Sequence, residues 1–170
     1  MLNNNWIKKY TFIIFIILVI YFLFNSFSDS KIDNDFEIAF EFVLKWEGGY
    51  NESEESKYGI TKMFYPNLDI KNLTVDNAKK IYYQDYWLKV GCDKLLFPFN
   101  IIVFDTAVNC GVRWAKEIYY SSISYEDYLF KRIEFYAGLK TTKYYLRGWV
   151  NRICDLYKLI NKDIKDGRDR

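Results

Sequence analysis

The sequence predicts a mainly α domain that carries at most a small hairpin and is preceded by one N-terminal transmembrane helix. Apolar residues recur at helical spacing in several segments from residue 36 onward, which is typical of helices that bury one face. Gly48 and Gly49 follow the first of these segments, and glycines commonly end helices. Residues 10–24 are almost purely apolar (YTFIIFIILVIYFLF).

Composition excludes several classes of chemistry. The chain has 170 residues, a net charge of +2, three cysteines and no histidine. Catalysis by Ser-His-Asp or Cys-His sets and histidine-ligated metals are therefore excluded, and we expect no metal and no cofactor. The small net charge gives no reason to expect a nucleic-acid partner. An odd number of cysteines cannot all pair within one chain.

Residues 10–27 form the predicted membrane anchor, because an apolar run near this length can cross a bilayer. Lys8 and Lys9 precede the run and Lys31 is the first basic residue after it. This bias favours a cytoplasmic N-terminus at residues 1–9 and a body on the periplasmic or cell-wall side. A cleaved signal peptide is the alternative, but no Ala-x-Ala site follows the bulky run. The sequence favours an uncleaved signal-anchor and a lipid bilayer as one partner.

The helix that begins near Phe36 places an acid at its end. Its apolar stripe is formed by Phe36, Phe40, Val43 and Leu44. Glu47 lies four residues after Val43 and so continues this stripe toward the core. Partial desolvation disfavours the charged form of a carboxylate, as a general acid near neutral pH requires. A solvated or lysine-paired glutamate is the alternative interpretation.

Further helices and loops follow in order. Residues 50–56 read as an acidic loop, and Gly59 in the turn or short strand after it permits close backbone approach. Thr74 is expected to cap a helix that ends near Trp87, and Ser124 to cap another that Gly138 closes. The remaining expected helices span residues 99–112 and 145–164.

Five sequence runs, taken together and in order, resemble glycoside hydrolase family 108, a family of lysozyme-like peptidoglycan hydrolases. They are WEGGY, KYGIT, YYQDYW, FDTAVNCG and LRGWVNR, and they lie discontinuously within residues 36–159. The resemblance implies a lysozyme-like domain in which Glu47 is the catalytic acid. Asp85, in the third run, is expected to make an internal salt bridge or hydrogen bond.

The resemblance also indicates site residues around the acid. In the family, the loop after the acid is longer and ends in a threonine, and Ser56 stands at that position. Ser56 is therefore one candidate for the second catalytic group, with Glu54 or Glu55 as the other.

The family motifs also suggest residues that contact substrate. The substrate-binding candidates are Tyr50, Tyr58, Thr61, Asp105 and Asn109. The last two lie at i and i+4 on one helix face, where they either line the sugar cleft or only stabilise packing. The residues of the last run, Arg147, Trp149 and Arg152, are expected to clamp the C-terminus onto the domain.

The predicted organisation has a linker at residues 28–35, a lysozyme-like domain at 36–164 and a charged tail at 165–170. Within the domain, residues 36–91 form the catalytic part. Residues 92–164 form a reduced peptidoglycan-binding-like part, because the family's helical insert after Arg113 is shortened.

The predicted function is hydrolysis of the β-1,4 bond between N-acetylmuramic acid and N-acetylglucosamine in peptidoglycan. Such an activity suits a phage endolysin or an enzyme of the secretion-activator type. The alternative is a catalytically degenerate, membrane-anchored protein that binds peptidoglycan or serves an envelope secretion machinery. The shortened loop favours the alternative, whereas the retained Glu47 favours the enzyme.

Overall fold

The computed structural model describes residues 13–18, 34–53 and 55–167. The chain divides into two compact units, Met1–Asn34 and Asp35–Arg170. In the first unit, residues 13–18 are helical. Among the described residues, no helix has both the length and the apolar character needed to cross a bilayer. The anchor predicted at residues 10–27 lies mostly outside the described residues and stays a prediction.

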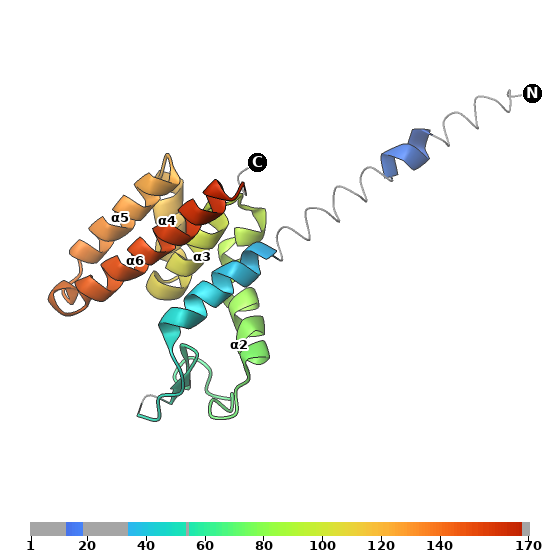
Figure 1. Ribbon diagram of the computed structural model, residues 1–170. Helices are drawn as coiled ribbons and strands as arrows, with labels where there is room; N and C mark the ends of the chain where they lie inside the picture. Colours follow the sequence, from blue (N-terminus) through green and yellow to red (C-terminus); the bar gives the residue numbers. More distant parts are fainter. Residues whose placement is uncertain (1–12, 19–33, 54, 168–170) are drawn as a thin grey trace, which may run out of the picture. The chain divides into compact units, whose positions relative to one another are not determined.

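The second unit is mainly helical, as the sequence predicts, with one small hairpin (Figure 1). All but the first residue of the helix of residues 34–47 belong to it. The later elements are β1 (Ser56–Lys57), β2 (Ile60–Thr61), α2 (Val75–Tyr82), the π-helix η1 (Tyr83–Leu88), the 3-10 helix η2 (Cys92–Lys94), α3 (Phe99–Cys110), α4 (Val112–Ser121), α5 (Tyr125–Ala137) and α6 (Thr142–Lys165). The strands β1 and β2 are antiparallel, with Ser56 opposite Thr61.

Local signals set several helix ends as predicted. Gly48, with φ of 72°, follows the last residue of the 34–47 helix. The Thr74 hydroxyl accepts a hydrogen bond from the Asn77 amide at 3.2 Å, which satisfies one of the free donors at the start of α2. The predicted Ser124 cap of α5 is likewise confirmed.

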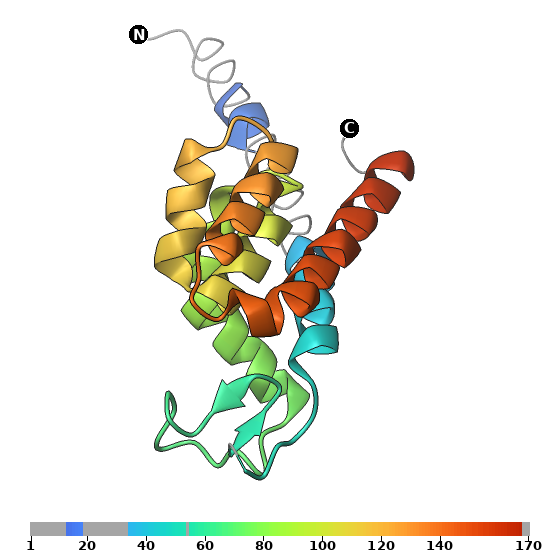
Figure 2. The ribbon, with the colours of Figure 1, turned by 90° about the vertical axis from the view of Figure 1, so that its left-hand side faces the viewer.

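An aromatic core joins the 34–47 helix to the middle of the chain. The Phe36 ring contacts Trp87 and Phe104, with centroid distances of 5.3 and 5.7 Å. One turn later, Phe40 contacts Tyr82 at 5.7 Å. The apolar stripe read from the sequence is therefore the face that packs on α2, η1 and α3. Figure 2 shows that the 34–47 helix and α2 both lead down to the hairpin.

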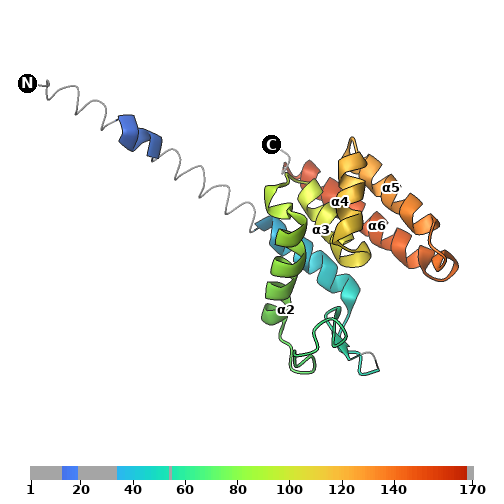
Figure 3. The ribbon, with the colours of Figure 1, turned by 180° about the vertical axis from the view of Figure 1, so that it is seen from behind.

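The remaining helices form a group on α3. α3 packs against α4, and α5 packs against both α4 and α6, a grouping seen from behind in Figure 3. The last helix begins at Thr142, earlier than the predicted residue 145. All three cysteines lie in the described part of the chain and are free thiols there.

The helix expected to run from Thr74 to Trp87 is not uniform. Its α-helical part ends at Tyr82, and residues Tyr83–Leu88 continue as a π-helix. A π-helix widens the turn and redirects side chains, a change that periodicity at 3.6 residues per turn does not anticipate. Such turns occur frequently at functional sites.

Candidate active site

An open cleft of about 780 Å³ lies at the end of the 34–47 helix, lined by residues 47–53 and Ser56. The helix ends at Glu47 and the chain turns away at Gly48. Glu47, the predicted acid, and Ser56, one of the candidates for the second catalytic group, therefore line one cavity. Tyr50, predicted to bind substrate, lines the same cavity.

Glu47 is held by a cation that comes from the other end of the chain. Its carboxylate oxygen Oε1 accepts a hydrogen bond of 2.7 Å from Nη1 of Arg152 in α6. The Arg152 side chain is 5% exposed, while that of Glu47 is 22% exposed. The desolvation expected from the sequence is thus accompanied by a charge partner that the sequence did not reveal.

Gly59, in the hairpin turn, lies against the second oxygen of Glu47. A Cβ placed on Gly59 would lie 2.8 Å from Glu47 Oε2 and 2.6 Å from the Tyr82 hydroxyl. Its φ of +75° is also a conformation that favours glycine. The close approach predicted from the sequence is therefore confirmed, and the group that approaches is the Glu47 side chain.

Two tyrosines complete the wall behind Glu47. The Tyr82 hydroxyl donates a hydrogen bond of 2.8 Å to the Tyr58 carbonyl. Burial raises the pKa of Tyr82, and the charge of Glu47 raises it further. Burial also raises the pKa of Tyr86, with added contributions from Asp85 and Glu47. Both groups therefore stay neutral phenols beside the carboxylate at physiological pH.

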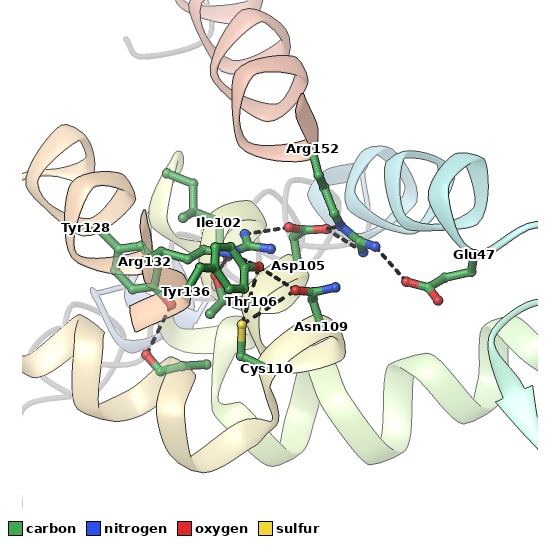
Figure 4. Close-up of polar contacts among 11 residues, drawn as sticks. Glu47, Ile102, Asp105, Thr106, Asn109, Cys110, Tyr128, Arg132, Tyr136 and Arg152 are labelled. Carbon is green, nitrogen blue, oxygen red and sulfur yellow. Dashed lines mark hydrogen bonds and ion pairs between the residues drawn. The ribbon is translucent and has the colours of Figure 1, made fainter. Parts of the chain in front are cut away.

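The charged residues behind Glu47 form a continuous buried chain (Figure 4). Asp105 in α3 is 1% exposed. Its Oδ1 accepts from Arg152 Nε at 2.9 Å, and its Oδ2 accepts from Arg132 Nη1 at 2.6 Å. Burial alone would raise the pKa of Asp105, but the charges of Arg132 and Arg152 overcome it and hold this pKa below its usual value.

The other predicted site residues have different surroundings. Tyr58 contributes its carbonyl to the bond from Tyr82. The Thr61 hydroxyl is buried and makes no hydrogen bond within the described part of the chain. Glu54 lies outside the described residues, and Glu55 is exposed with φ of 43°. Asp85 accepts a hydrogen bond of 2.7 Å from Tyr65, as the internal role expected for it requires.

The Asp105 and Asn109 pair lies in the interior rather than along the cleft. Both oxygens of Asp105 are occupied by guanidinium groups. The Asn109 side-chain oxygen accepts a hydrogen bond from the Tyr136 hydroxyl. Neither residue is among those that line the cavity beside Glu47. Of the two interpretations left open by the sequence, the geometry favours the packing role.

Sequence reasoning missed three residues of this site. Arg132 is fully buried on the face of α5 that also carries Tyr128 and Tyr136, and a charged residue on an apolar stripe was the available signal. Arg152 fixes α6 to the rest of the domain, as expected, but nothing in the sequence indicated that it contacts Glu47. Glu52 lines the cleft with Glu47, and the sequence did not distinguish it within the acidic loop of residues 50–56.

The geometry is suited to proton transfer by one carboxylate, that of Glu47, which lines the open cavity. Oε1 of Glu47 accepts a hydrogen bond from Arg152, and Oε2 lies on the side of Gly59. A group held in one orientation by a partly buried ion pair is well placed to deliver a proton to a bound ligand.

Residues 40–111 match the family model of glycosyl hydrolase 108. The matched segment includes Glu47, the hairpin, η1 and α3, whereas Arg132 and Arg152 lie beyond it. No curated protein and no solved structure matches the chain. This match over residues 40–111 agrees with the resemblance of the sequence motifs to glycoside hydrolase family 108.

Proposed function

We propose that this protein is a muramidase that cleaves the β-1,4 bond between N-acetylmuramic acid and N-acetylglucosamine, with Glu47 as the general acid. The observation that carries the proposal is the position of Glu47. This carboxylate lies at the rim of an open cleft, within the segment that matches a glycoside hydrolase family. The cleft volume of about 780 Å³ is large enough to admit sugar rings.

In this mechanism Glu47 protonates the oxygen of the leaving sugar while positive charge develops on the other ring. Since Arg152 occupies Oε1, the proton is delivered from Oε2. After the bond breaks, the ionised carboxylate regains the full stabilisation of its ion pair with Arg152. General acid–base help of this kind contributes about 10²–10⁴ in rate.

The second catalytic role is to activate water or to stabilise the developing charge. Ser56, with Glu54 or Glu55, remains a candidate for it, and Glu52 joins them because it lines the same cleft as Glu47. Ser56 acts by holding a water, whereas any of the carboxylates acts as a base or a countercharge.

The second candidate function is a protein that binds peptidoglycan without cutting it, as an accessory to an envelope secretion machinery. The observation that favours it is the contact between Arg152 and Glu47. This contact makes Glu47 the counter-ion of a largely buried guanidinium, a structural role that needs no proton transfer.

Treatment of purified sacculi with the full-length protein in mild detergent distinguishes the two functions. A muramidase lowers the turbidity of the suspension and releases muropeptides that carry N-acetylmuramic acid at their reducing ends. Binding of the protein to sacculi with no new reducing ends would support the accessory function instead. Products with N-acetylglucosamine at the reducing end would contradict the bond assignment.

We also propose that residues 10–27 are an uncleaved anchor that places the catalytic body on the periplasmic or cell-wall side. The apolar run in the sequence supports this proposal. We expect the protein to stay in the membrane fraction through a carbonate wash and to keep residues 1–9. A soluble mature form that begins near Ser28 would show that the run is an export signal only.

A further inference from the structure

The buried charges behind Glu47 form a chain that starts at α5 and ends in the cleft. Arg132 contacts Asp105 at 2.6 Å, Asp105 contacts Arg152 at 2.9 Å, and Arg152 contacts Glu47 at 2.7 Å. The links join α5, α3, α6 and the 34–47 helix. Figure 4 shows these residues in one continuous row.

The chain is electrically neutral only when Glu47 is ionised. Arg132 and Arg152 contribute two positive charges, and Asp105 and Glu47 contribute two negative charges. Protonation of Glu47 leaves one positive charge without a counter-ion in a region of low dielectric, where charges interact strongly. The protonation of Glu47 is therefore coupled to every charge in the chain.

The interior members of the chain keep their charges across the physiological range. The pKa of Asp105 lies below its ordinary value despite burial, because two guanidiniums surround it. Burial alone would lower the pKa values of Arg132 and Arg152, but the neighbouring carboxylates raise both. Glu47 is the most exposed member, with 22% of its side chain open to solvent, and it lines the cleft.

We propose that Asp105 and Arg132 are positioning residues that set the protonation of Glu47 through the guanidinium of Arg152. Asp105 shares Arg152 with Glu47 and so weakens the hold of that cation on the catalytic carboxylate. Arg132 in turn offsets the charge of Asp105, so the attraction of Arg152 for Glu47 is stronger than it would be without Arg132. The two residues therefore act in opposite directions. The proposal rests on the proposed role of Glu47 as an acid.

The other groups that face this chain do not change its charge near neutral pH. Tyr82 from α2 and Tyr86 from η1 face Glu47, and their raised pKa values keep them neutral. Tyr136 and Cys110, beside Arg132, also have pKa values raised by burial. Glu52 also lines the cleft and is exposed, so water and salt screen its charge.

Asp105→Asn and Arg132→Gln test the proposal because they remove charges of opposite sign. In Asp105→Asn, Arg152 acts on Glu47 alone, and we expect the titration midpoint of Glu47 to fall by about one pH unit. In Arg132→Gln, the charge of Asp105 is no longer offset by Arg132 and cancels more of the attraction of Arg152 for Glu47. We therefore expect the midpoint to rise by about as much. Carbon NMR of the Glu47 carboxyl in full-length protein measures both, with Glu47→Gln used to assign the signal.

Asp155→Asn is the matched control for Asp105→Asn. Asp155 lies on α6 close to Arg152 in sequence, but its partners are the exposed lysines Lys45 and Lys158. This variant removes the same charge from a screened site and should leave the Glu47 midpoint where the wild type has it. Arg132→Lys, which keeps the charge, should restore the midpoint that Arg132→Gln moves.

The outcomes separate a role in protonation from a role in packing. If both interior variants lower the melting temperature but leave the midpoint unchanged, the residues are only structural and the proposal is overturned. If Asp105→Asn does not fold, Arg132→Gln alone tests the proposal, because removal of the Arg132 guanidinium leaves Asp105 paired with Arg152. An upward shift supports the proposal, and no shift overturns it.

The titration is independent of catalysis, so the two proposals can fail separately. If the wild-type protein cleaves no peptidoglycan but the two variants shift the Glu47 midpoint in opposite directions, the proposed function fails and the charge coupling stands. Where cleavage is observed, a midpoint shift of about one unit changes the protonated fraction of Glu47 about tenfold above the midpoint. The cleavage rate should then fall about tenfold in Asp105→Asn and rise about tenfold in Arg132→Gln at such a pH.

Discussion

Replacing Glu47 with glutamine should lower the rate of peptidoglycan cleavage by a factor of about 10²–10⁴, the contribution of a general acid. Glutamine has nearly the shape of glutamate and keeps an oxygen that can accept from Arg152 Nη1, 2.7 Å away in the wild type. It has no proton to give to the leaving sugar oxygen. The release of reducing ends from sacculi measures the loss.

The fold should survive this change. Arg152 keeps its ion pair with Asp105 and can still donate to the glutamine oxygen, so the guanidinium stays hydrogen-bonded although one positive charge of the chain loses its counter-ion. The loss in free energy of unfolding should be about 1–3 kcal/mol. Glu41→Gln is the matched control, because Glu41 lies exposed on the same helix. It should change neither cleavage nor stability appreciably.

Two outcomes would contradict the assignment of Glu47. Equal cleavage by the wild type and by Glu47→Gln would mean that another group donates the proton. Binding of both proteins to sacculi without cleavage by either would identify a binding protein in which Glu47 is only a structural partner of Arg152.

Gly59→Ala should impair both stability and catalysis. The new Cβ would lie 2.6 Å from the Tyr82 hydroxyl and 2.8 Å from Glu47 Oε2. Tyr82 is buried and bonded to the Tyr58 carbonyl, so the more mobile carboxylate is the group that moves. Misplacement of a catalytic group by about 1 Å can cost 10²-fold in rate. We expect a rate loss of that order, with about 1–3 kcal/mol lost from the free energy of unfolding through overpacking.

Gly91→Ala separates the backbone strain in this prediction from the steric contact. Gly91 also has a positive φ, of 90°, but a Cβ there would meet nothing within 4 Å. Thermal unfolding and cleavage assays on both variants give the comparison. Gly91→Ala should lose stability only through strain and keep the wild-type rate. A Gly59→Ala protein as active as Gly91→Ala would show that the close approach to Glu47 has no catalytic importance.

The sequence alone determined the features that depend on neighbours along the chain. The apolar spacing from Phe36 to Leu44 predicted a helix and its buried face, and Gly48 predicted its end. The caps at Thr74 and Ser124 followed from their hydroxyls and the residues just after them. The position of Glu47 at a helix end followed as well, because a helix period and a glycine terminator are local signals.

Some local structure escaped the same reasoning. The π-helix at Tyr83–Leu88 replaces the regular turns expected there, because its side chains are placed by packing of the aromatic core rather than by residue spacing. The i, i+4 relation of Asp105 and Asn109 was correct, but spacing on one helix does not tell which neighbour covers that face.

Only the tertiary structure decided the electrostatic surroundings of the acid. Arg152 lies 105 positions beyond Glu47 in the chain, and 47 beyond Asp105. Arg132 reaches Asp105 across 27 positions. No periodic pattern links residues so far apart, since their meeting depends on how α3, α5 and α6 pack against the 34–47 helix. The sequence therefore identified which carboxylate stands at the cleft, and packing determined which charges govern its proton.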